Sequence, residues 1–222
     1  MRIPFHSSFT IAALSLLLSA CSESFTDSRD GQSYNIVKIG NLTWMADNLN
    51  YATEASACPD GDSRNCKRLG RLYTWAEAKM VCPEGWRLPT KADFAALISA
   101  VNLATSGDAA MSRAGNSGVV SNKVGAALKS RDGWFKKGNG TDEFGFNALP
   151  AGYCGAISKM DDGTISGGKF DGIGGYAYFW SATEDPENPE SNAYYLFLAF
   201  NSKSASVNSF SKNDLRSVRC VQ

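Results

Sequence analysis

Six cysteines are distributed along the 222 residues, and they restrict the fold more than any other residue type. The first, Cys21, ends an apolar N-terminal segment, and the others follow at positions 58, 66, 82, 154 and 220. No two of them have the CxxC spacing of a zinc ribbon or a thioredoxin-like motif. Because the number after Cys21 is odd, disulfide pairing among these cysteines leaves one thiol without a partner.

The N-terminal segment has the organisation of a secretory signal. Arg2 precedes an apolar run from Ile11 to Leu18, which is shorter than the roughly 20 apolar residues that span a bilayer. The residues Leu18-Ser-Ala-Cys21 resemble a bacterial lipobox, in which cleavage occurs before the cysteine and the cysteine is then lipidated. We therefore expect residues 1–20 to be a lipoprotein signal peptide. An ordinary signal peptide with a coincidental cysteine is the alternative.

Lipidation of Cys21 would anchor the chain in the bacterial cell envelope, with palmitate among the acyl chains. By analogy with Gram-negative sorting, Ser22 in place of an aspartate leaves delivery to the outer membrane open, and we expect the outer membrane or the cell surface. The polar residues 21–30 have no apolar periodicity, and we interpret them as a lipidated tether. The rest of the chain has no internal repeat and no break in composition, so we expect one domain over residues 31–222.

An oxidising compartment favours disulfides among the later cysteines. Cys58 and Cys66 bracket a polar, turn-rich segment that a local disulfide would close. Cys82 and Cys220 would then connect the end of an early helix to the last strand, and Cys154 would remain a buried free thiol. This is the pairing we expect, although the sequence alone leaves the connectivity open.

Charge and histidine content argue against several classes of function. After the predicted signal the chain carries 21 basic and 22 acidic residues, so no positive excess points to nucleic acid. The single histidine, His6, lies within that signal, which leaves the mature protein without an imidazole for a catalytic pair or a metal site. No Gly-rich phosphate loop or nucleophile motif is present either. We therefore predict a protein that is not an enzyme and that has no metal site and no cofactor.

Local patterns in the first half predict a hairpin followed by two main helices. Residues 34–39 and 42–45 have strand character and are joined by a Gly-Asn turn. Capping boxes begin at Thr74 and Thr90, and each indicates the start of a helix. The second helix has apolar residues on one face, at positions 94, 97, 98 and 101.

The second half has the character of an antiparallel sheet with long loops. We expect a loop over residues 106–121, a short helix over 123–129, and strands over 178–183, 193–200, 204–210 and 216–221. Both alternating faces of residues 194–200 are apolar, which predicts a central strand buried on both sides. Asp161-Asp-Gly-Thr164 is typical of a hairpin turn. Together these elements predict an α+β fold.

Five motifs occur in order along the chain: Leu72-Tyr-Thr-Trp75, Cys82-Pro-Glu-Gly-Trp-Arg-Leu-Pro-Thr90, Asp142-Glu-Phe-Gly-Phe-Asn-Ala-Leu-Pro-Ala-Gly152, Phe179-Trp-Ser181 and Ser217-Val-Arg-Cys-Val221. Together they resemble the Fibrobacter succinogenes major paralogous domain, over about residues 31–222. That family is similar in fold to C-type lectin-like domains and to the formylglycine-generating group, and it occurs in secreted proteins and lipoproteins. The resemblance implies a C-type lectin-like architecture and an envelope location rather than an activity.

The lectin-like resemblance implies a disulfide between the first helix and the last strand, which agrees with Cys82 and Cys220. Sugar-binding C-type lectins hold calcium with a Glu-Pro-Asn or Gln-Pro-Asp loop and a Trp-Asn-Asp strand. The acidic loop 184–190 and Asn213-Asp214 do not match that pattern in register, so a solvated turn is favoured over a calcium site. The formylglycine-generating oxidases use two reactive cysteines, and only Cys154 is left here.

Aromatic residues are the candidate ligand contacts. Trp134, Tyr153, Tyr176 and Tyr178 lie in Gly-rich segments that we expect to be loops, where exposed rings stack on sugars or anchor a protein partner. Burial in the core is the alternative for each of them, and it is the favoured one. It is also the interpretation we favour for two tryptophans inside the family motifs, Trp86 and Trp180.

Three functions remain, in this order. The first is a lipid-anchored, non-catalytic recognition module for a polysaccharide or an envelope protein, and the second is a structural or assembly protein of the envelope. A carboxylate-based enzyme is the third, with candidate residues Glu84, Asp93, Asp142 and Glu143. A concave aromatic-lined groove would favour the first function, a flat apolar patch the second, and a close carboxylate pair in a cleft the third.

Overall fold

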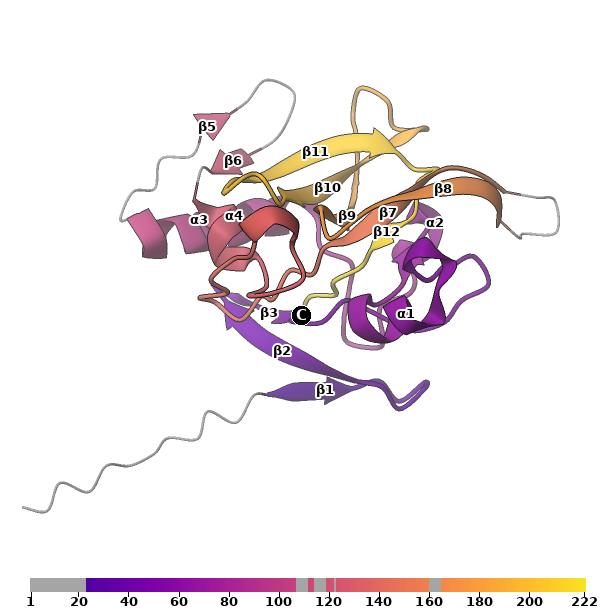
Figure 1. Cartoon of the computed structure of the whole chain (residues 1–222), viewed down its shortest axis with the longest axis horizontal. Coiled ribbons are helices and arrows are strands. Elements are labelled where there is room, and N and C mark those ends of the chain that lie inside the picture. Colours follow the sequence, from indigo (N-terminus) through magenta and orange to yellow (C-terminus); the bar gives the residue numbers. More distant parts are fainter. Residues whose placement is uncertain (1–22, 107–111, 114–118, 122, 160–164) are drawn as a thin grey trace, which may run out of the picture.

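The computed structural model describes residues 23–106, 112–113, 119–121, 123–159 and 165–222. Two β-sheets and a set of helices make up this part of the chain, which confirms the predicted α+β class (Figure 1). The predicted signal peptide, Cys21 and the predicted turn at 161–164 lie outside the described residues. Within those residues, no helix is long and apolar enough to cross a membrane.

The chain opens with a three-stranded antiparallel sheet, drawn in indigo below the rest of the molecule in Figure 1. β2 (Ser33–Ile39) and β3 (Leu42–Met45) form the predicted hairpin. β1 (Ser24–Thr26) pairs with β2, so the segment predicted to be a tether is part of the fold from Ser24 onward. Phe25 is the one apolar residue of β1, and a single apolar position produces no periodicity that a sequence pattern could reveal.

The segment between Cys58 and Cys66, expected to be a polar loop, contains helical turns. η1 (Pro59–Gly61) is followed by α1 (Ser63–Leu69). The Asp62 side chain caps α1 by accepting a hydrogen bond from the Arg64 N–H at 2.9 Å, and Leu69 is buried. The cap, the buried face and the Cys58–Cys66 disulfide together stabilise helical turns in a segment whose composition is typical of a turn.

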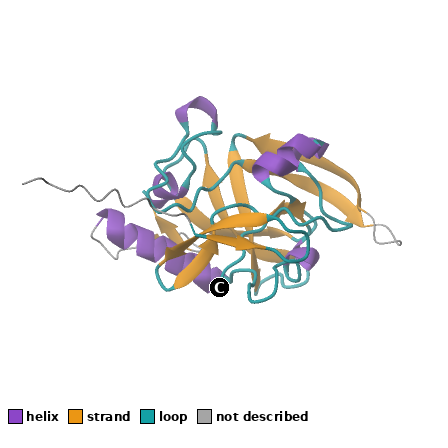
Figure 2. Ribbon diagram, turned by 90° about the horizontal axis from the view of Figure 1, so that it is seen from below, coloured by secondary structure: helices purple, strands orange, loops and turns teal. Residues whose placement is uncertain are grey.

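Both predicted helix starts form, but the capping box is reciprocal only at Thr90, where Asp93 accepts from the Thr90 N–H. At the first helix start, Glu77 accepts instead from the Ala55 N–H. Thr74 Oγ1 accepts a hydrogen bond at the start of α2 (Trp75–Ala78), and Thr90 Oγ1 does the same before α3 (Lys91–Ser106). α2 ends at Ala78, earlier than the predicted extension toward Val81. α3, the longest helix in Figure 2, buries the predicted apolar positions 94, 97, 98 and 101. α4 (Val124–Leu128) lies within the predicted segment 123–129.

A nine-stranded, predominantly antiparallel sheet forms the centre of the molecule, in the order β4-β12-β9-β10-β11-β6-β5, with β7 and β8 attached beside β9. The path consists of β4 (Leu72–Tyr73), β12 (Arg216–Ser217), β9 (Tyr176–Glu184), β10 (Asn192–Ala199), β11 (Ala205–Ser211), β6 (Val119–Ser121) and β5 (Ser112–Arg113). The predicted central position of β10 is confirmed. Two differences from prediction are that 106–121 contains two short strands and that the last strand stops at Ser217.

A long hairpin of β7 (Ala151–Lys159) and β8 (Ile165–Ile173) was not expected. Its strands contain five glycines, and glycine weakens any strand pattern because it has no side chain to pack. At one end of this hairpin β7 also pairs with β9, in parallel, through Gly152 and Ala177. That contact places the hairpin against the central strands, and it decides where the candidate site forms.

Both faces of the central strands are buried, as predicted. One face packs under α3 and α4 through residues such as Phe179 and Leu196. The opposite face packs against α2 and the first sheet through residues such as Trp180 and Tyr195. Trp86 and Trp180, predicted to belong to the core, are 9% and 0% exposed.

Both expected disulfides are present. Cys58 pairs with Cys66, and Cys82 pairs with Cys220 across a sequence separation of 138 residues. Cys154 is a free cysteine and is buried, and burial raises the pKa of its thiol. A buried thiol with a raised pKa is poorly reactive, which agrees with a structural role for Cys154.

Candidate functional site

Three of the four predicted ligand contacts lie together. Tyr153 on β7 and Tyr176 and Tyr178 on β9 are half-buried, and the Tyr178 ring centroid lies 5.2 Å from that of Tyr153 and 6.0 Å from that of Tyr176. They come from paired strands rather than from the loops we expected. Strands hold side chains more rigidly than loops do, so these rings form a pre-organised surface.

Trp134 does not belong to this group. It is 6% exposed and packs in the core below α4, and its indole N–H donates to Ser130 Oγ at 2.9 Å and to the Ala148 carbonyl at 3.2 Å. The prediction of an exposed ligand contact at Trp134 is therefore wrong. The indole N–H finds its acceptors inside the protein, which is the usual condition for burying a tryptophan.

The tyrosines continue into a longer aromatic array that the sequence analysis missed. Phe197 on β10 is paired in register with Tyr178, and its ring stacks on Tyr176 with centroids 5.8 Å apart. Phe200 lies 6.2 Å from Tyr176, and Phe135 lies 6.5 Å from Phe200. We call these six residues the aromatic array: Phe135, Tyr153, Tyr176, Tyr178, Phe197 and Phe200. Alternate positions on β9 and β10 were the available signal, but the pairing register was needed to align them.

Two neighbouring depressions open along the aromatic array. The first, which we call the Phe135 depression, has a volume of about 390 Å³ and is lined by Phe135, Tyr176 and Phe200 together with Phe170, Asp60 and Asp171. The second, the Asp214 depression, has a volume of about 300 Å³ and is lined by Tyr153, Phe210, Asp214, Asp171 and Lys169. Asp171 on β8 lines both depressions, and it is paired with Tyr153 on β7. Phe135 and Phe210 are both more than half exposed.

Asp214 is held in place by a buried arginine. Arg216 is 2% exposed and donates a hydrogen bond to Asp214 Oδ2 at 2.7 Å. The guanidinium carbon lies 3.9 Å from the centre of the Tyr195 ring and 4.8 Å from that of Tyr178. Arg216 therefore fixes one carboxylate of the depression and also supports the array from behind. Burial raises the pKa of Tyr153 and Tyr178, so both phenols stay neutral hydrogen-bonding groups.

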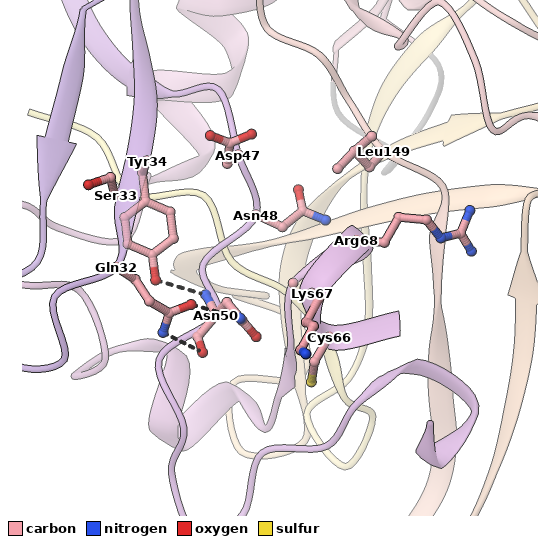
Figure 3. A pocket seen from close by; sticks show the side chains of 11 residues that line it. Gln32, Ser33, Tyr34, Asp47, Asn48, Asn50, Cys66, Lys67, Arg68 and Leu149 are labelled. Atoms are coloured by element: carbon pink, nitrogen blue, oxygen red, sulfur yellow. Dashed lines mark hydrogen bonds between the residues drawn. The ribbon is translucent and has the colours of Figure 1, made fainter. Parts of the chain in front are cut away.

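A smaller polar pocket lies between the first sheet and α1 (Figure 3). Its volume is about 140 Å³, and Gln32 and Tyr34 both point toward Asn50. The amide of Asn50 donates to Gln32 Oε1 at 2.7 Å, and its backbone N–H donates to the Tyr34 hydroxyl at 3.2 Å. These contacts join the polar groups to one another, so the pocket is better explained as a junction between the start of β2 and the loop after β3 than as a ligand site.

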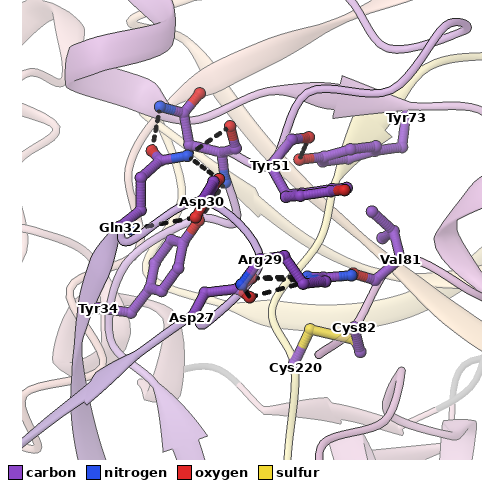
Figure 4. Close-up of polar contacts among 11 residues, drawn as sticks. Asp27, Arg29, Asp30, Gln32, Tyr34, Tyr51, Tyr73, Val81, Cys82 and Cys220 are labelled. Carbon is purple, nitrogen blue, oxygen red and sulfur yellow. Dashed lines mark hydrogen bonds and ion pairs between the residues drawn. A yellow bond between two sulfur atoms is a disulfide. The ribbon is translucent and has the colours of Figure 1, made fainter. Parts of the chain in front are cut away.

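The segment before β2 is secured by an ion pair (Figure 4). Asp27 is fully buried and accepts from Arg29 Nη2 at 2.6 Å, and the same nitrogen donates to the Val81 carbonyl at 2.9 Å. The hydrogen bond from Arg29 lowers the pKa of Asp27. The guanidinium also lies 4.0 Å from the Tyr51 ring centre. Residues 24–30 are therefore attached to the domain next to the Cys82–Cys220 disulfide, as Figure 4 shows.

The acidic loop 184–190 is organised by protein contacts. Asp185 accepts from the Glu187 N–H at 3.1 Å and from Ser209 Oγ at 2.6 Å, and Glu184 is ion-paired with Lys212. The described residues contain no cluster of three or more side chains suited to a metal ion. These observations agree with a hydrogen-bonded turn at this loop.

The carboxylates named as catalytic candidates lie outside the two depressions. Asp93 accepts from Arg87 and from Thr90 at the start of α3, and Asp142 accepts from the Asn147 N–H. Glu84 and Glu143 are exposed. None of the four lines the two depressions, where Asp171 and Asp214 lie instead.

The model of one protein family, the Fibrobacter succinogenes major domain, matches residues 37–222. The chain belongs to that family. No curated protein and no solved structure matches this chain.

The motifs that resemble the Fibrobacter succinogenes major domain contact one another. The Trp75 indole donates to the Ser181 carbonyl at 2.8 Å, and the Trp180 indole donates to the Tyr73 carbonyl at 2.9 Å. The fully buried Arg219 donates to the carbonyls of Phe146 and Asn147. These motifs therefore build the scaffold of the family domain. None of the six residues of the aromatic array belongs to a motif, which explains why recognition of the family did not reveal the array.

Proposed function

We propose that this protein is a lipid-anchored, non-catalytic recognition module of the bacterial cell envelope, and that it binds a polysaccharide along the aromatic array. The observation that carries the proposal is the joining of two depressions by one continuous set of rings. An aromatic surface with a few fixed polar groups is the usual composition of a small-molecule site.

The chemistry of the array suits sugar rings. The C–H face of a pyranose packs on an aromatic face, and Tyr176, Phe135 and Phe210 offer such surfaces at the two depressions. Asp171 and Asp214 supply carboxylate oxygens that accept hydrogen bonds from adjacent sugar hydroxyls. The C-type lectin-like resemblance supports the same interpretation, since that architecture often presents ligand sites.

The location rests on the N-terminal sequence. Lipidation of Cys21 would tether the domain to the outer membrane or the cell surface, where an extracellular polysaccharide is accessible. Since β1 begins at Ser24, the chain between the lipid and the folded domain reaches at most about 10 Å. The domain would therefore stay close to the membrane.

Binding of the chain from residue 22 onward to neutral and acidic polysaccharides, measured by calorimetry with and without calcium, tests this proposal. We expect saturable, calcium-independent binding that weakens at least about tenfold in Tyr176→Ala, a loss typical of one stacking contact. Leu103→Ala is the control because Leu103 is an exposed apolar residue on α3 that lines neither depression. The proposal fails if no polysaccharide binds, or if Tyr176→Ala and Leu103→Ala behave alike.

A carboxylate-based hydrolase is the second candidate, because Asp171 and Asp214 line the same depression. Glycoside hydrolysis requires one carboxyl group to deliver a proton to the leaving oxygen, whereas Asp214 is ion-paired with Arg216. Incubation of the bound polysaccharide with the protein should therefore release no new reducing ends. Release that stops in Asp171→Asn would favour the enzyme instead.

A further inference from the structure

The two depressions differ in the amount of aromatic surface that they offer. Four rings from four segments of the chain line the Phe135 depression, those of Phe135, Phe170, Tyr176 and Phe200. The Asp214 depression contains two rings, those of Tyr153 and Phe210. Because a sugar stacks on aromatic surface, the Phe135 depression provides more of the contact that a polysaccharide requires.

The charged groups beside the two depressions differ in their freedom to contact a ligand. Asp214 is held in a buried ion pair, and its side chain is only 5% exposed. Lys136 Nζ lies 5.7 Å from the centre of the Phe200 ring, at the edge of the Phe135 depression, and Asp171 lines this depression. Lys136 and Asp171 are both exposed, and neither belongs to an ion pair found in the described residues. An ammonium donor and a carboxylate acceptor together suit sugar hydroxyl groups, which both accept and donate hydrogen bonds.

The backbone beside the Phe135 depression has an unfavourable conformation. Lys136 has a φ of 48° and Lys137 a φ of 65°, and Asp60, which lines the depression, has a φ of 56°. These are three of the five residues other than glycine that have a positive φ in the described part of the chain. Left-handed backbone is costly for residues with a side chain, and such residues cluster at functional sites. Their concentration here favours this depression over the other one.

Close contacts hold η2 (Phe135–Lys137) in this conformation. The Phe135 N–H donates to the Gly174 carbonyl at 2.7 Å, and the Gly138 N–H donates to the Phe135 carbonyl at 2.7 Å. A Cβ added at Gly138 would lie 2.4 Å from the Phe200 carbonyl oxygen, so the segment packs tightly against the array. The ring of Phe135 nevertheless remains 55% exposed. A fixed backbone that exposes an aromatic ring suits binding, because little conformational entropy is lost when the ligand arrives.

We infer that the Phe135 depression is the subsite that holds the polysaccharide, with Phe135 as the stacking contact and Lys136 as a hydrogen-bond donor to a sugar hydroxyl. This inference rests on the proposed function and adds the subsite and the residues that fix the sugar. The Asp214 depression then contributes only a weak secondary contact. Its exposed ring, Phe210, is part of β11 and lies 5.9 Å from the Arg216 guanidinium carbon, so this ring has a packing role without a ligand.

Two phenylalanines provide a matched test, because Phe135 and Phe210 are 55% and 56% exposed and lie one in each depression. The probes are a soluble glucan, a soluble xylan and a soluble mannan, and calorimetry measures their binding to the chain from residue 22 onward. For each probe that binds the wild type, we expect Phe135→Ala to weaken binding at least about tenfold and Phe210→Ala no more than about twofold. Circular dichroism should show both variants folded, because each changes an exposed side chain.

The two adjacent lysines provide a second matched pair. Lys136 and Lys137 are both exposed and left-handed, so Lys136→Gln and Lys137→Gln change the net charge equally and leave the backbone strain in place. We expect Lys136→Gln to weaken binding about threefold, which corresponds to one hydrogen bond, and Lys137→Gln to bind as the wild type does. Equal affinities of the two variants would overturn the role of Lys136.

The ranking of the variants separates the inference from the proposed function. Equal losses in Phe135→Ala and Phe210→Ala, or a larger loss in Phe210→Ala, would overturn the inference. A loss of affinity in Tyr176→Ala would in that case still support the proposed function. Absence of binding by all three polysaccharides would overturn both.

Discussion

Arg216 connects the core to the candidate site. Its guanidinium is ion-paired with Asp214, and the two side chains are 2% and 5% exposed. A buried ion pair contributes little net stability, but removal of one partner leaves an uncompensated charge in the interior. Arg216 should therefore matter both to folding and to the position of the carboxylate.

Arg216→Met should lower the free energy of unfolding by about 3–5 kcal/mol, because Asp214 would remain buried without a counter-ion. Urea denaturation followed by tryptophan fluorescence measures this change. Arg64→Met is the matched control, since Arg64 is ion-paired with Asp62 but its side chain is 88% exposed, and we expect no measurable change there. Equal stability of the wild type and Arg216→Met would show that Asp214 needs no partner.

At the scale of elements, the turn between β8 and β9 holds the end of the aromatic array. Gly174 in this turn has a φ of 78°, and a Cβ added there would lie 2.4 Å from the Phe135 ring. The Gly174 carbonyl also accepts a hydrogen bond from the Phe135 N–H at 2.7 Å. The turn and the Phe135 segment therefore fit together closely only because residue 174 has no side chain.

Gly174→Ala should displace Phe135 and weaken polysaccharide binding. It should also lower the stability, because alanine disfavours the positive φ at this position. Gly31→Ala isolates that cost, because Gly31 has a φ of 75° and no atom within 4 Å of an added Cβ. We expect Gly31→Ala to lose about 1 kcal/mol of stability and to bind polysaccharide as the wild type does. Gly174→Ala should lose more stability than Gly31→Ala, and it should also bind polysaccharide more weakly. Denaturation and calorimetry on the two variants provide the comparison. Equal stability losses with unchanged binding in both would contradict the role of Phe135.

At the scale of the whole molecule, the two disulfides join segments at very different separations. Cys82 and Cys220 are 138 residues apart, whereas Cys58 and Cys66 are 8 apart. A disulfide that closes a longer loop removes more conformational entropy from the unfolded chain. The long disulfide also connects the end of the α2 region to the C-terminal segment, which pairs with Thr43 of the first sheet.

Replacing Cys82 and Cys220 together by alanine should lower the free energy of unfolding by roughly 4–5 kcal/mol, and replacing Cys58 and Cys66 by roughly 2–3 kcal/mol. Both double variants avoid creating new free thiols, so each serves as the control for the other. Thermal and urea denaturation of the two variants show which of them loses more stability. A larger loss from the short disulfide would contradict the loop-entropy argument.

Local patterns in the sequence predicted much of the fold. The opening hairpin, the starts of α2 and α3, the apolar face of α3 and the central position of β10 were predicted, because each follows from spacing within one segment. β1, α1 and the β7–β8 hairpin were not. They are short, polar or rich in glycine, and they are stabilised by contacts with distant segments that no local window contains.

The sequence by itself determined the α+β class, the family and the residue types from which a site could be built, and it suggested the disulfide pairing that the structure then decided. It also identified three of the six rings of the aromatic array, Tyr153, Tyr176 and Tyr178. Only the tertiary structure decided that Trp134 is buried, that Phe135, Phe197 and Phe200 complete the array, and that Asp171 lies beside it. The physical reason is that strand register and the docking of β7 on β9 bring these residues together, and both are long-range contacts that local composition does not encode.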